Sequence, residues 1–231
     1  MADFQRPPTA QEAALVEVRS RILRGDIAPG TPMRQEDLAA SLGVSRVPVR
    51  EALRMLESEG HVTYIPHRGY RVTELDLDDL EEIYHLRALI EDDLARRALA
   101  RRDIGHVDSV RAAHARLVTA EASGPTDATA LAAANRAFHW AILRPTPRAE
   151  RILTTLWDSS EVYRARWFAL SDNVTRGARE HVRARTAVEA GDPDALVAIL
   201  TEHRAGAVSA LRAQLARAAT QPVPSASAAV G

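Results

Sequence analysis

The sequence predicts a mainly α-helical protein in which three short helices and a β-hairpin precede an antiparallel bundle of about six helices. Two observations predict this class. Apolar residues recur at three- and four-residue intervals along most of the chain, which is the period of a helix with one buried face. Ala, Leu and Arg are abundant while aromatic residues make up only 4%, a composition typical of helices.

Length and charge limit the classes of protein that the chain can belong to. With 231 residues it is long enough for two modest domains. Its 30 basic side chains, all arginine, and 31 acidic ones leave a formal net charge of −1. This balance excludes a globally basic nucleic-acid binder but permits a local basic surface.

Cysteine is absent, which excludes disulfides, cysteine-ligated zinc fingers and thiol catalysis. The N-terminal residues do not resemble a signal peptide, and no apolar run is long enough to span a bilayer. We therefore expect a cytoplasmic protein with no membrane partner.

Two helices are expected before the turn at Gly43. The first spans residues 11–24 and ends at Gly25, and the second spans residues 34–43. Their expected buried positions are Ala14, Leu15, Val18, Ile22, Leu38, Ala39 and Leu42.

A third helix over residues 45–60 follows almost at once. Ser45 is its expected N-cap and Pro48 falls in the first turn, where a missing N–H is harmless. The β-prone runs "VTYI" and "YRV", split by "PHRG", then predict a hairpin. The inward stripe of the third helix consists of Val49, Leu53 and Leu56.

Two short helices around a tight turn, followed by a hairpin, are typical of a winged helix-turn-helix. Ser45, Arg46 and Arg50 lie in the first turns of the third helix, where they can reach phosphates or base edges. His67, Arg68 and Gly69 form a basic hairpin tip. The alternative is a small helical bundle that merely carries exposed arginines.

The run "LAASLGVSRVPVREALRMLESEGHV", with "PHRGYRV" after it and Pro29-Gly30 ahead, resembles the GntR family of bacterial transcription regulators over residues 10–74. Val47 stands where that family often has threonine. Glu36 stands where some members contact DNA with arginine, and Arg34 is the nearest substitute. The resemblance implies a DNA-contacting set of Arg34, Ser45, Arg46, Val47, Pro48, Arg50, His67, Arg68 and Gly69.

From Asp76 onward the sequence predicts helices only, separated by "SGPTD", "RPTP", "LSDN" and "GDPD". The tail is rich in Pro, Ser and Ala and is expected to be disordered. The expected helices are 76–102, 106–122, 127–144, 147–170, 173–190 and 193–219. The expected domains are 8–74 for DNA binding and 75–217 for effector binding and dimerisation, with residues 218–231 as the tail.

Three histidines, His139, His181 and His203, lie on the apolar faces of separate predicted helices. A single inward histidine is more often a core residue than a ligand. If the three helices pack as a bundle, however, their imidazoles can converge, and neutral imidazole binds zinc and nickel well.

The segments "NRAFHWAI", "REHVRARTAVEAGDPDAL" and "TEHRAGAV" resemble the FCD ligand-binding domain of the FadR subfamily over residues 77–217. Its metal-binding members have an acidic ligand, a histidine four positions later, and two histidines 21 residues apart. The resemblance implies a divalent metal, zinc or nickel, on His139, His181 and His203. Asn135 takes the acidic position, so one negative charge is missing.

The same resemblance implies that metal and arginines hold the carboxylate of a small organic acid. The expected effector contacts are Arg87, which matches the inward arginine of the family, Glu91 one turn later, and Arg164. Arg87 and Glu91 could equally form a simple intrahelical ion pair. Arg164 and Arg166 are weaker candidates, because that helix face could simply be charged and solvated.

These features together predict a homodimeric, ligand-responsive transcription regulator that binds a palindromic operator, in most members of the family as a repressor. A rival hypothesis is a metal-dependent hydrolase built on the three histidines, which would need a carboxylate as general base where Asn135 stands. A third is a metal-structured scaffold or sensor. We predict a regulator and not an enzyme.

Overall fold

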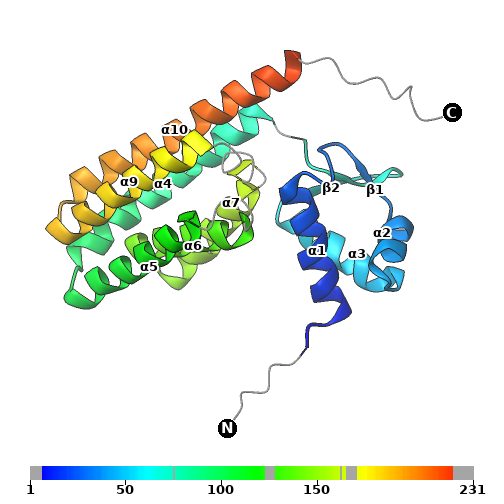
Figure 1. Cartoon of the computed structure of the whole chain (residues 1–231), viewed down its shortest axis with the longest axis horizontal. Helices are drawn as coiled ribbons and strands as arrows, with labels where there is room; N and C mark the ends of the chain where they lie inside the picture. The colour runs from blue at the N-terminus through cyan, green and yellow to red at the C-terminus, as the bar shows by residue number, and fades with distance from the viewer. Residues whose placement is uncertain (1–6, 75, 123–127, 162, 165–170, 221–231) are drawn as a thin grey trace, which may run out of the picture.

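The chain folds into two lobes joined by a short connection (Figure 1). The computed structural model describes residues 7–74, 76–122, 128–161, 163–164 and 171–220. None of the helices in these ranges combines the length and apolarity that crossing a bilayer requires.

The N-terminal lobe, here called the head, contains three helices and a three-stranded antiparallel sheet in the order β1-β3-β2. Thr9 begins the first helix with a capping box to Glu12, and Gly25 ends it in the left-handed conformation. The elements are α1 (Ala10–Arg24), β1 (Pro32–Met33), α2 (Gln35–Leu42), α3 (Arg46–Ser58), β2 (Val62–Ile65) and β3 (Gly69–Val72).

All three predicted helices and the hairpin of the head form, but strand β1 was not predicted. Pro32 pairs with Arg71 and Met33 with Tyr70, so β1 extends the hairpin sheet. Two residues beginning with proline carry no strand pattern of their own; only pairing with a distant strand makes them one. Ser45 is the N-cap of α3 as predicted, but its side chain makes no capping hydrogen bond.

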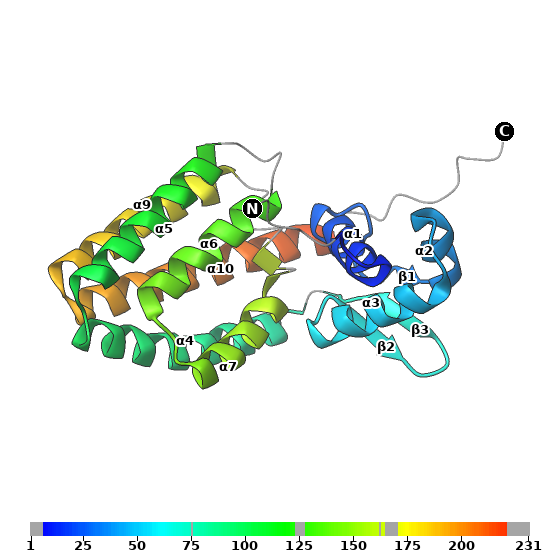
Figure 2. The same ribbon diagram turned by 90° about the horizontal axis from the view of Figure 1, so that it is seen from below.

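The second lobe, here called the helical domain, is a bundle with α4 and α7 along one side and α5 and α9 along the other (Figure 2). Its apolar core includes Phe138, Leu153 and Trp157. Its helices are α4 (Leu77–Ala100), α5 (Ile104–Ala122), α6 (Ala128–Leu143), α7 (Pro147–Ser159), α9 (Ser171–Ala190) and α10 (Pro193–Thr220).

The predicted helix over residues 147–170 is interrupted at Ser160. Helix α7 ends at Ser159, and Ser160 forms a turn in which its hydroxyl donates to the carbonyl of Trp157 at 2.9 Å. This local hydrogen bond competes with continuation of the helix. Helical geometry resumes at Glu161, Tyr163 and Arg164, while residues 162 and 165–170, including Arg166, lie outside the described residues.

The predicted tail begins later than expected, because α10 continues to Thr220. Residues 218–220 are therefore helical. The rest of the predicted disordered tail, residues 221–231, lies outside the described residues.

The two lobes meet where α3 of the head approaches α7. A Cβ on Gly60 would stand 3.4 Å from Ser159. His61 is fully buried at this junction, with its Nε2 3.7 Å from carboxylate oxygens of both Glu59 and Glu161. Burial, reinforced by the charge of Arg19, lowers the pKa of His61 to about 4. The junction therefore holds a neutral imidazole between two carboxylates, one from each lobe.

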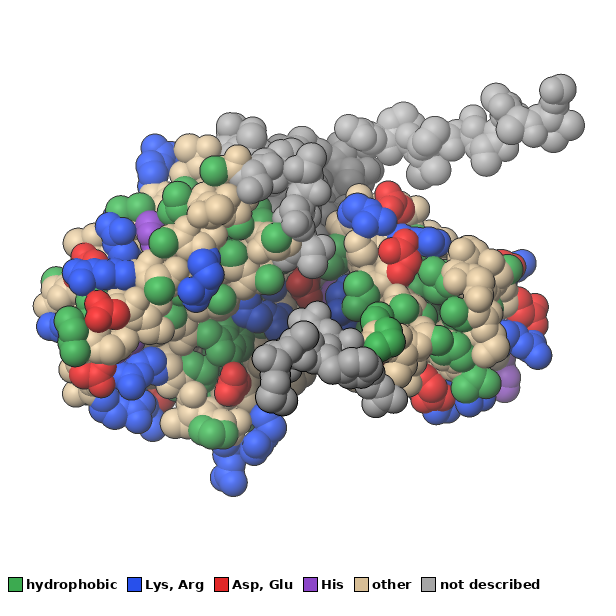
Figure 3. All heavy atoms as spheres, turned by 60° about the horizontal axis from the view of Figure 1, so that its bottom comes forward, with side chains coloured by type: hydrophobic (Ala, Val, Ile, Leu, Met, Phe, Trp, Pro, Cys, Tyr) green, Lys and Arg blue, Asp and Glu red, His purple; other side chains and the backbone are tan. Residues whose placement is uncertain are grey.

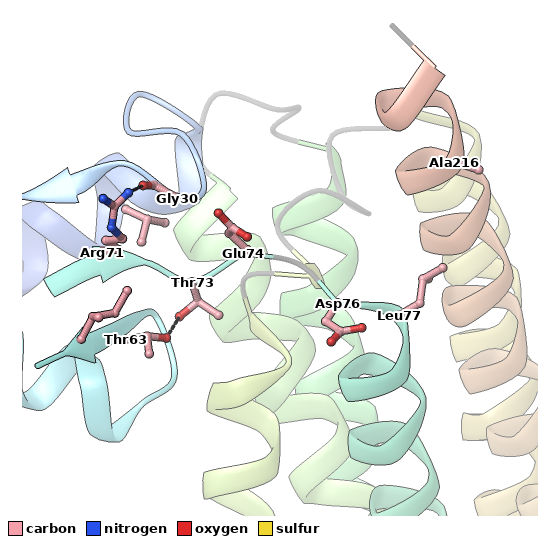
Figure 4. Close-up of a pocket in the computed structure, with 10 residues that line it drawn as sticks. Gly30, Thr63, Arg71, Thr73, Glu74, Asp76, Leu77 and Ala216 are labelled. Carbon is pink, nitrogen blue, oxygen red and sulfur yellow. Dashed lines mark hydrogen bonds between the residues drawn. The ribbon is translucent and has the colours of Figure 1, made fainter. Parts of the chain in front are cut away.

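The space-filling view shows the lobes separated by a hollow (Figure 3). One part of the boundary lies between strands β2 and β3 and the ends of α4 and α10 (Figure 4). Several of its polar groups already pair within the chain: Arg71 Nη1 donates to the carbonyl of Gly30 at 2.9 Å, and the hydroxyls of Thr63 and Thr73 are 3.3 Å apart. We therefore interpret this region as a boundary between the two lobes and not as a ligand site.

Candidate DNA-reading face and metal-effector cavity

The predicted DNA-reading residues of the head share one exposed face. Arg46 and Arg50 leave the first turns of α3 into solvent, and Arg34 is the N-cap of α2. At the hairpin tip His67 and Gly69 have positive φ angles of 62° and 78°, which make a tight turn. The remaining predicted members Ser45, Val47 and Arg68 are exposed, and Pro48 is half-buried.

A groove beside the hairpin brings together four of these residues, Arg34, Arg46, Arg68 and Gly69, and Glu36 and Arg71 also line it. The other five predicted residues do not line this groove. Glu36 was noted only as a departure from the family pattern. Here its carboxylate lies 2.8 Å from Nη1 of Arg46, and the side chains are 76% and 69% exposed. An ion pair this exposed is worth about 0 to 1 kcal/mol, so a nucleic acid can displace it readily.

The three predicted histidines converge in the helical domain from α6, α9 and α10. The ring centroid of His139 lies 5.6 Å from that of His181 and 5.4 Å from that of His203. The remaining pair, His181 and His203, is separated by 5.1 Å. One ring nitrogen of each residue lies within 4.8 Å of the others.

The chemistry of this histidine cluster fits a divalent metal. Both ring nitrogens of His139 and His181 are buried and lack a hydrogen-bond partner among the described residues. Burial is the main cause that lowers the pKa of His181 to about 4 and that of His139 well below its usual range. The imidazoles of His139 and His181 are therefore neutral at neutral pH, which is the form that ligates metals. Ligation at zinc–nitrogen distances of about 2.0–2.1 Å would require the rings to close slightly around an ion.

Asn135 lies one turn before His139 on α6 and is buried. It lines a small cavity of about 20 Å³ together with His203. This volume holds about one water-sized group. The other lining residues are Tyr84, Arg87, Trp157, Arg164 and Ala207.

Arg87 and Glu91 form the predicted ion pair, with Nε and Oε1 2.9 Å apart, and both are fully buried. Glu91 also accepts from Trp157 Nε1 at 2.9 Å and from Arg204 Nη1 at 2.9 Å. Burial alone would raise the pKa of Glu91, but Arg87 and Arg204 outweigh it and hold this pKa below its usual value. Because these cations and the indole occupy its oxygens, Glu91 acts as the counter-charge behind the cavity and is not part of its lining.

Arg164 differs from Arg87 in having no carboxylate in hydrogen-bond contact. Its Nε and Nη1 are buried without a partner among the described residues, and Nη2 reaches only the carbonyl of Trp157 at 3.4 Å. Burial and the neighbouring Arg87 lower the pKa of Arg164 to about 10, so it remains charged at neutral pH. The guanidiniums of Arg87 and Arg164 lie 4.2 and 4.3 Å from the ring centroid of Trp157. The cavity thus offers a desolvated cation to an anion.

Sequence reasoning missed several residues of this region. Arg204 falls four residues after Leu200 and three before Ala207, so its place on an inward stripe was a usable signal. Tyr84 and Trp157 also line the cavity, and neither was predicted as a site residue. Glu180 also escaped notice: its carboxylate lies 2.6 Å from Nδ1 of His203, 23 positions away. Nothing in a single sequence marks such a contact.

Comparisons with known proteins agree with this two-part organisation. The family model described as "Bacterial regulatory proteins, gntR family" matches residues 10–72, and that of the "FCD domain" matches residues 82–206. The chain is 33% identical over 185 residues to the "Probable D-xylose utilization operon transcriptional repressor" of Paenarthrobacter nicotinovorans, covering 79% of this chain and 80% of the relative. It is 29% identical over 223 residues to an HTH-type transcriptional regulator, BphR, of Paraburkholderia xenovorans, covering 91% of both.

Solved structures are similar in fold. Escherichia coli McbR/YncC aligns with a TM-score of 0.71 at 21% identity, covering 90% of this chain and 100% of that one. A GntR transcriptional regulator from Rhodococcus sp. RHA1 aligns with a TM-score of 0.72 at 22% identity, covering 88% and 97%. At these identities the likeness concerns the fold alone.

Proposed function

The chain belongs to the gntR family of bacterial regulatory proteins, and from this premise we propose that a small carboxylate bound in the helical domain controls its affinity for a DNA operator. That it is a transcriptional regulator with a helix-turn-helix and an FCD domain, and not an enzyme, follows from the family and its relatives. This excludes the hydrolase hypothesis. The observation that carries the finer proposal is the buried guanidinium of Arg164 beside His203, because its Nε and Nη1 have no hydrogen-bond partner among the described residues.

On DNA, Arg46 and Arg50 would read base edges in the major groove, while Arg34 and Arg68 would neutralise phosphates on either side. Val47 is 59% exposed and supports an apolar contact with a thymine methyl group. Ser45, Pro48, His67 and Gly69 would shape the helix start and the hairpin tip.

This DNA assignment can be tested with a duplex selected by the wild-type protein from a random-sequence pool. Arg46→Ala or Arg50→Ala should weaken binding about 10- to 100-fold, which corresponds to the roughly 1–3 kcal/mol of a lost bidentate base contact. Circular dichroism should show unchanged helical content. The matched control is Arg97→Ala on α4, an exposed arginine of the helical domain. Equal affinity of Arg46→Ala and the control would contradict the assignment.

We further propose that His139, His181 and His203, with Asn135 in the fourth position, hold one divalent ion. The ion would supply Lewis-acid attraction for a ligand carboxylate, and Arg164 with Arg87 would neutralise the same group. Zinc and nickel suit three imidazoles best. The amide of Asn135 offers an oxygen without charge, which weakens its attraction for a dication.

Elemental analysis of purified protein tests the metal assignment. We expect about one equivalent of metal per chain in the wild type and loss of that metal in His181→Ala. His85→Ala, which removes an exposed histidine of α4, is the control and should keep the metal. A wild-type protein that stays metal-free in added zinc or nickel would support the core-histidine hypothesis instead.

The effector assignment can be tested by thermal shift with a panel of small carboxylic acids, with and without divalent metal. A binder raises the melting temperature by mass action, and Arg164→Met should abolish that rise. Arg97→Ala should retain it. A shift that survives Arg164→Met would place the ligand elsewhere.

Transmission to the head has a short route in this chain. Arg136, next to Asn135 on α6, pairs with Asp158 of α7. Glu161 has a carboxylate oxygen 3.7 Å from Nε2 of His61 of the head, and its negative charge favours the charged form of Arg164. An anion on Arg164 would compete with Glu161 for this cation. That competition would change the charges that meet at the junction and thereby favour one arrangement of the heads.

A homodimer on a palindromic operator is the arrangement we propose for DNA binding, with repression as the outcome. Two exposed leucines on α4, Leu86 and Leu89, support a contact between copies on that face. Sedimentation of the wild type should give twice the chain mass, and Leu89→Glu should shift it toward monomer. A wild type that sediments as a monomer would contradict the dimer.

A further inference from the structure

Two acidic side chains lie next to Nδ1 atoms of the histidine cluster. Glu180 precedes His181 on α9 but contacts His203 of α10, with Oε2 2.6 Å from Nδ1. Glu121, near the end of α5, has Oε1 3.5 Å from Nδ1 of His181. The side chains of Glu180 and Glu121 are only 7% and 14% exposed, so their charges are poorly screened by water.

The contact of Glu180 fixes which nitrogen of His203 carries hydrogen. A carboxylate can only accept, so Nδ1 of His203 donates and Nε2 keeps its lone pair. The hydrogen bond also sets the orientation of the ring. In this state Nε2 is the atom available to ligate an ion.

Glu180 is itself held in place. Its other oxygen lies 3.8 Å from Nε of Arg176, and Nη2 of Arg176 donates to the carbonyl of Gly206 at 3.0 Å. A Cβ on Gly206 would stand 3.2 Å from this guanidinium, so the close approach needs a glycine there. The carboxylate is therefore clamped between α9 and α10.

Glu121 makes a looser version of the same contact. At 3.5 Å its oxygen is too far from Nδ1 of His181 for a good hydrogen bond. A small inward movement of His181 around an ion, or of Glu121 toward the ring, would change its strength. Its contribution should therefore be smaller than that of Glu180.

The charges of these two glutamates matter because the ligand set has none. Three neutral imidazoles and the amide of Asn135 leave the two positive charges of a dication unbalanced within the set. Glu180 and Glu121 bring two negative charges to the next layer, one beside His203 and one beside His181.

We propose that Glu180, and more weakly Glu121, are positioning residues that orient the ligating imidazoles and replace the negative charge missing at Asn135. The inference rests on the proposed metal site. It assigns these residues a role in holding the ion and none in contacting the effector.

The test is metal affinity, measured on the full chain by competition between the metal-free protein and a chromophoric chelator. Glu180→Gln keeps a hydrogen-bond acceptor but removes the charge, and it should weaken zinc or cobalt binding about 10- to 100-fold. Glu121→Gln should weaken it less. Glu180→Asp, which keeps the charge, should recover part of the loss.

Glu202→Gln is the matched control, since Glu202 also neighbours His203 on α10 but is exposed and pairs with Arg183 at 2.9 Å. It should leave metal affinity unchanged. The cobalt absorption spectrum gives a second readout: Glu180→Gln should alter it if the His203 ring turns, and Glu202→Gln should not. The melting temperature of the metal-free variants separates these effects from loss of folding.

A double variant tests whether negative charge is what Glu180 supplies to the metal site. Asn135→Asp alone should tighten metal binding, and added to Glu180→Gln it should restore affinity toward the wild-type value. If Glu180→Gln binds metal as well as Glu202→Gln does, the inference is overturned while the metal site stands. If the wild type binds no metal at all, the metal site and this inference both fall.

Discussion

The DNA-reading face and the metal-effector cavity both rely on arginine, but they place it in opposite environments. Arg46 on the reading face is 69% exposed and pairs with Glu36, which is more exposed still. Arg87 in the cavity is 3% exposed and is bound to a buried carboxylate. The same side chain is thus a solvated, replaceable cation in one lobe and a fixed structural charge in the other.

The charged side chains of the two lobes therefore serve different purposes. Exposed guanidiniums keep their hydration until DNA arrives, so they contribute to binding and little to stability. Buried guanidiniums must be compensated within the fold, and an uncompensated one such as Arg164 has a strong demand for an anion. Three substitutions can break or sharpen this contrast.

The largest effect is expected where a buried counter-charge is removed. Glu91→Ala should lower the free energy of unfolding by about 3–5 kcal/mol, because Arg87 and Arg204 would lose the buried carboxylate between them. Urea unfolding at neutral pH measures this change. Asp93→Ala is a matched control on the same helix, since Asp93 and Arg97 form an i,i+4 pair at 2.8 Å but are both exposed. The control should change stability little; equal losses in the two variants would remove the contrast between buried and exposed charges.

An intermediate effect is expected at the junction between the lobes. The pKa of His61 is about 4 in the folded chain and 6.5 is its ordinary value, so the unfolded chain binds the proton first as pH falls. The contribution of His61 to the free energy of unfolding should therefore be fully present above pH 6.5 and decrease as pH falls toward 4. Between pH 7.5 and 5 the loss due to His61 should be about 2 kcal/mol.

His61→Leu should remove that part of the acid sensitivity, as seen in urea unfolding at the two pH values. His67→Asn is the control, because His67 is exposed on the hairpin tip and asparagine tolerates its positive φ angle. An unchanged pH dependence in His61→Leu would mean that the imidazole is already hydrated in the folded chain.

The smallest effect is expected on the reading face. Glu36→Gln removes a negative charge that faces incoming phosphates and frees Arg46, so affinity for a selected duplex should rise by about 3- to 10-fold at low salt, roughly 1 kcal/mol. Fluorescence anisotropy with increasing salt should show this gain shrinking. Stability should not change. Weaker binding in Glu36→Gln would show instead that Glu36 accepts a hydrogen bond from a base.

Most of the fold could be predicted because the buried residues of a helix recur in the sequence with a period of 3.6 residues. Positions such as Leu53 and Leu56 of α3 are buried as that period predicts. The sequence-based prediction of secondary structure was wrong where a non-local contact or a competing hydrogen bond determines the local structure. Pro32 and Met33 become a strand only by pairing with β3, and the hydroxyl of Ser160 helps to end a helix whose pattern would continue.

The candidate cavity was partly predictable for the same reason. His139, His181 and His203 lie on inward stripes, so their convergence followed once the helices packed together. The ion pair between Glu91 and Arg87 could be predicted from their spacing of four residues, while contact of Glu91 with an effector stays a prediction. The partners of Glu91 also include Trp157 and Arg204, which lie 66 and 113 positions away.

The sequence by itself determined the order of the helices, the exposed arginines of α3 and the three inward histidines, because these depend on local period and residue type. Only the tertiary structure decided which charges are compensated. Arg87 and Arg164 are both buried in the structure, yet one meets Glu91 and the other has no carboxylate in hydrogen-bond contact among the described residues. The energy of a buried charge depends on neighbours brought from distant helices, and no local pattern records them.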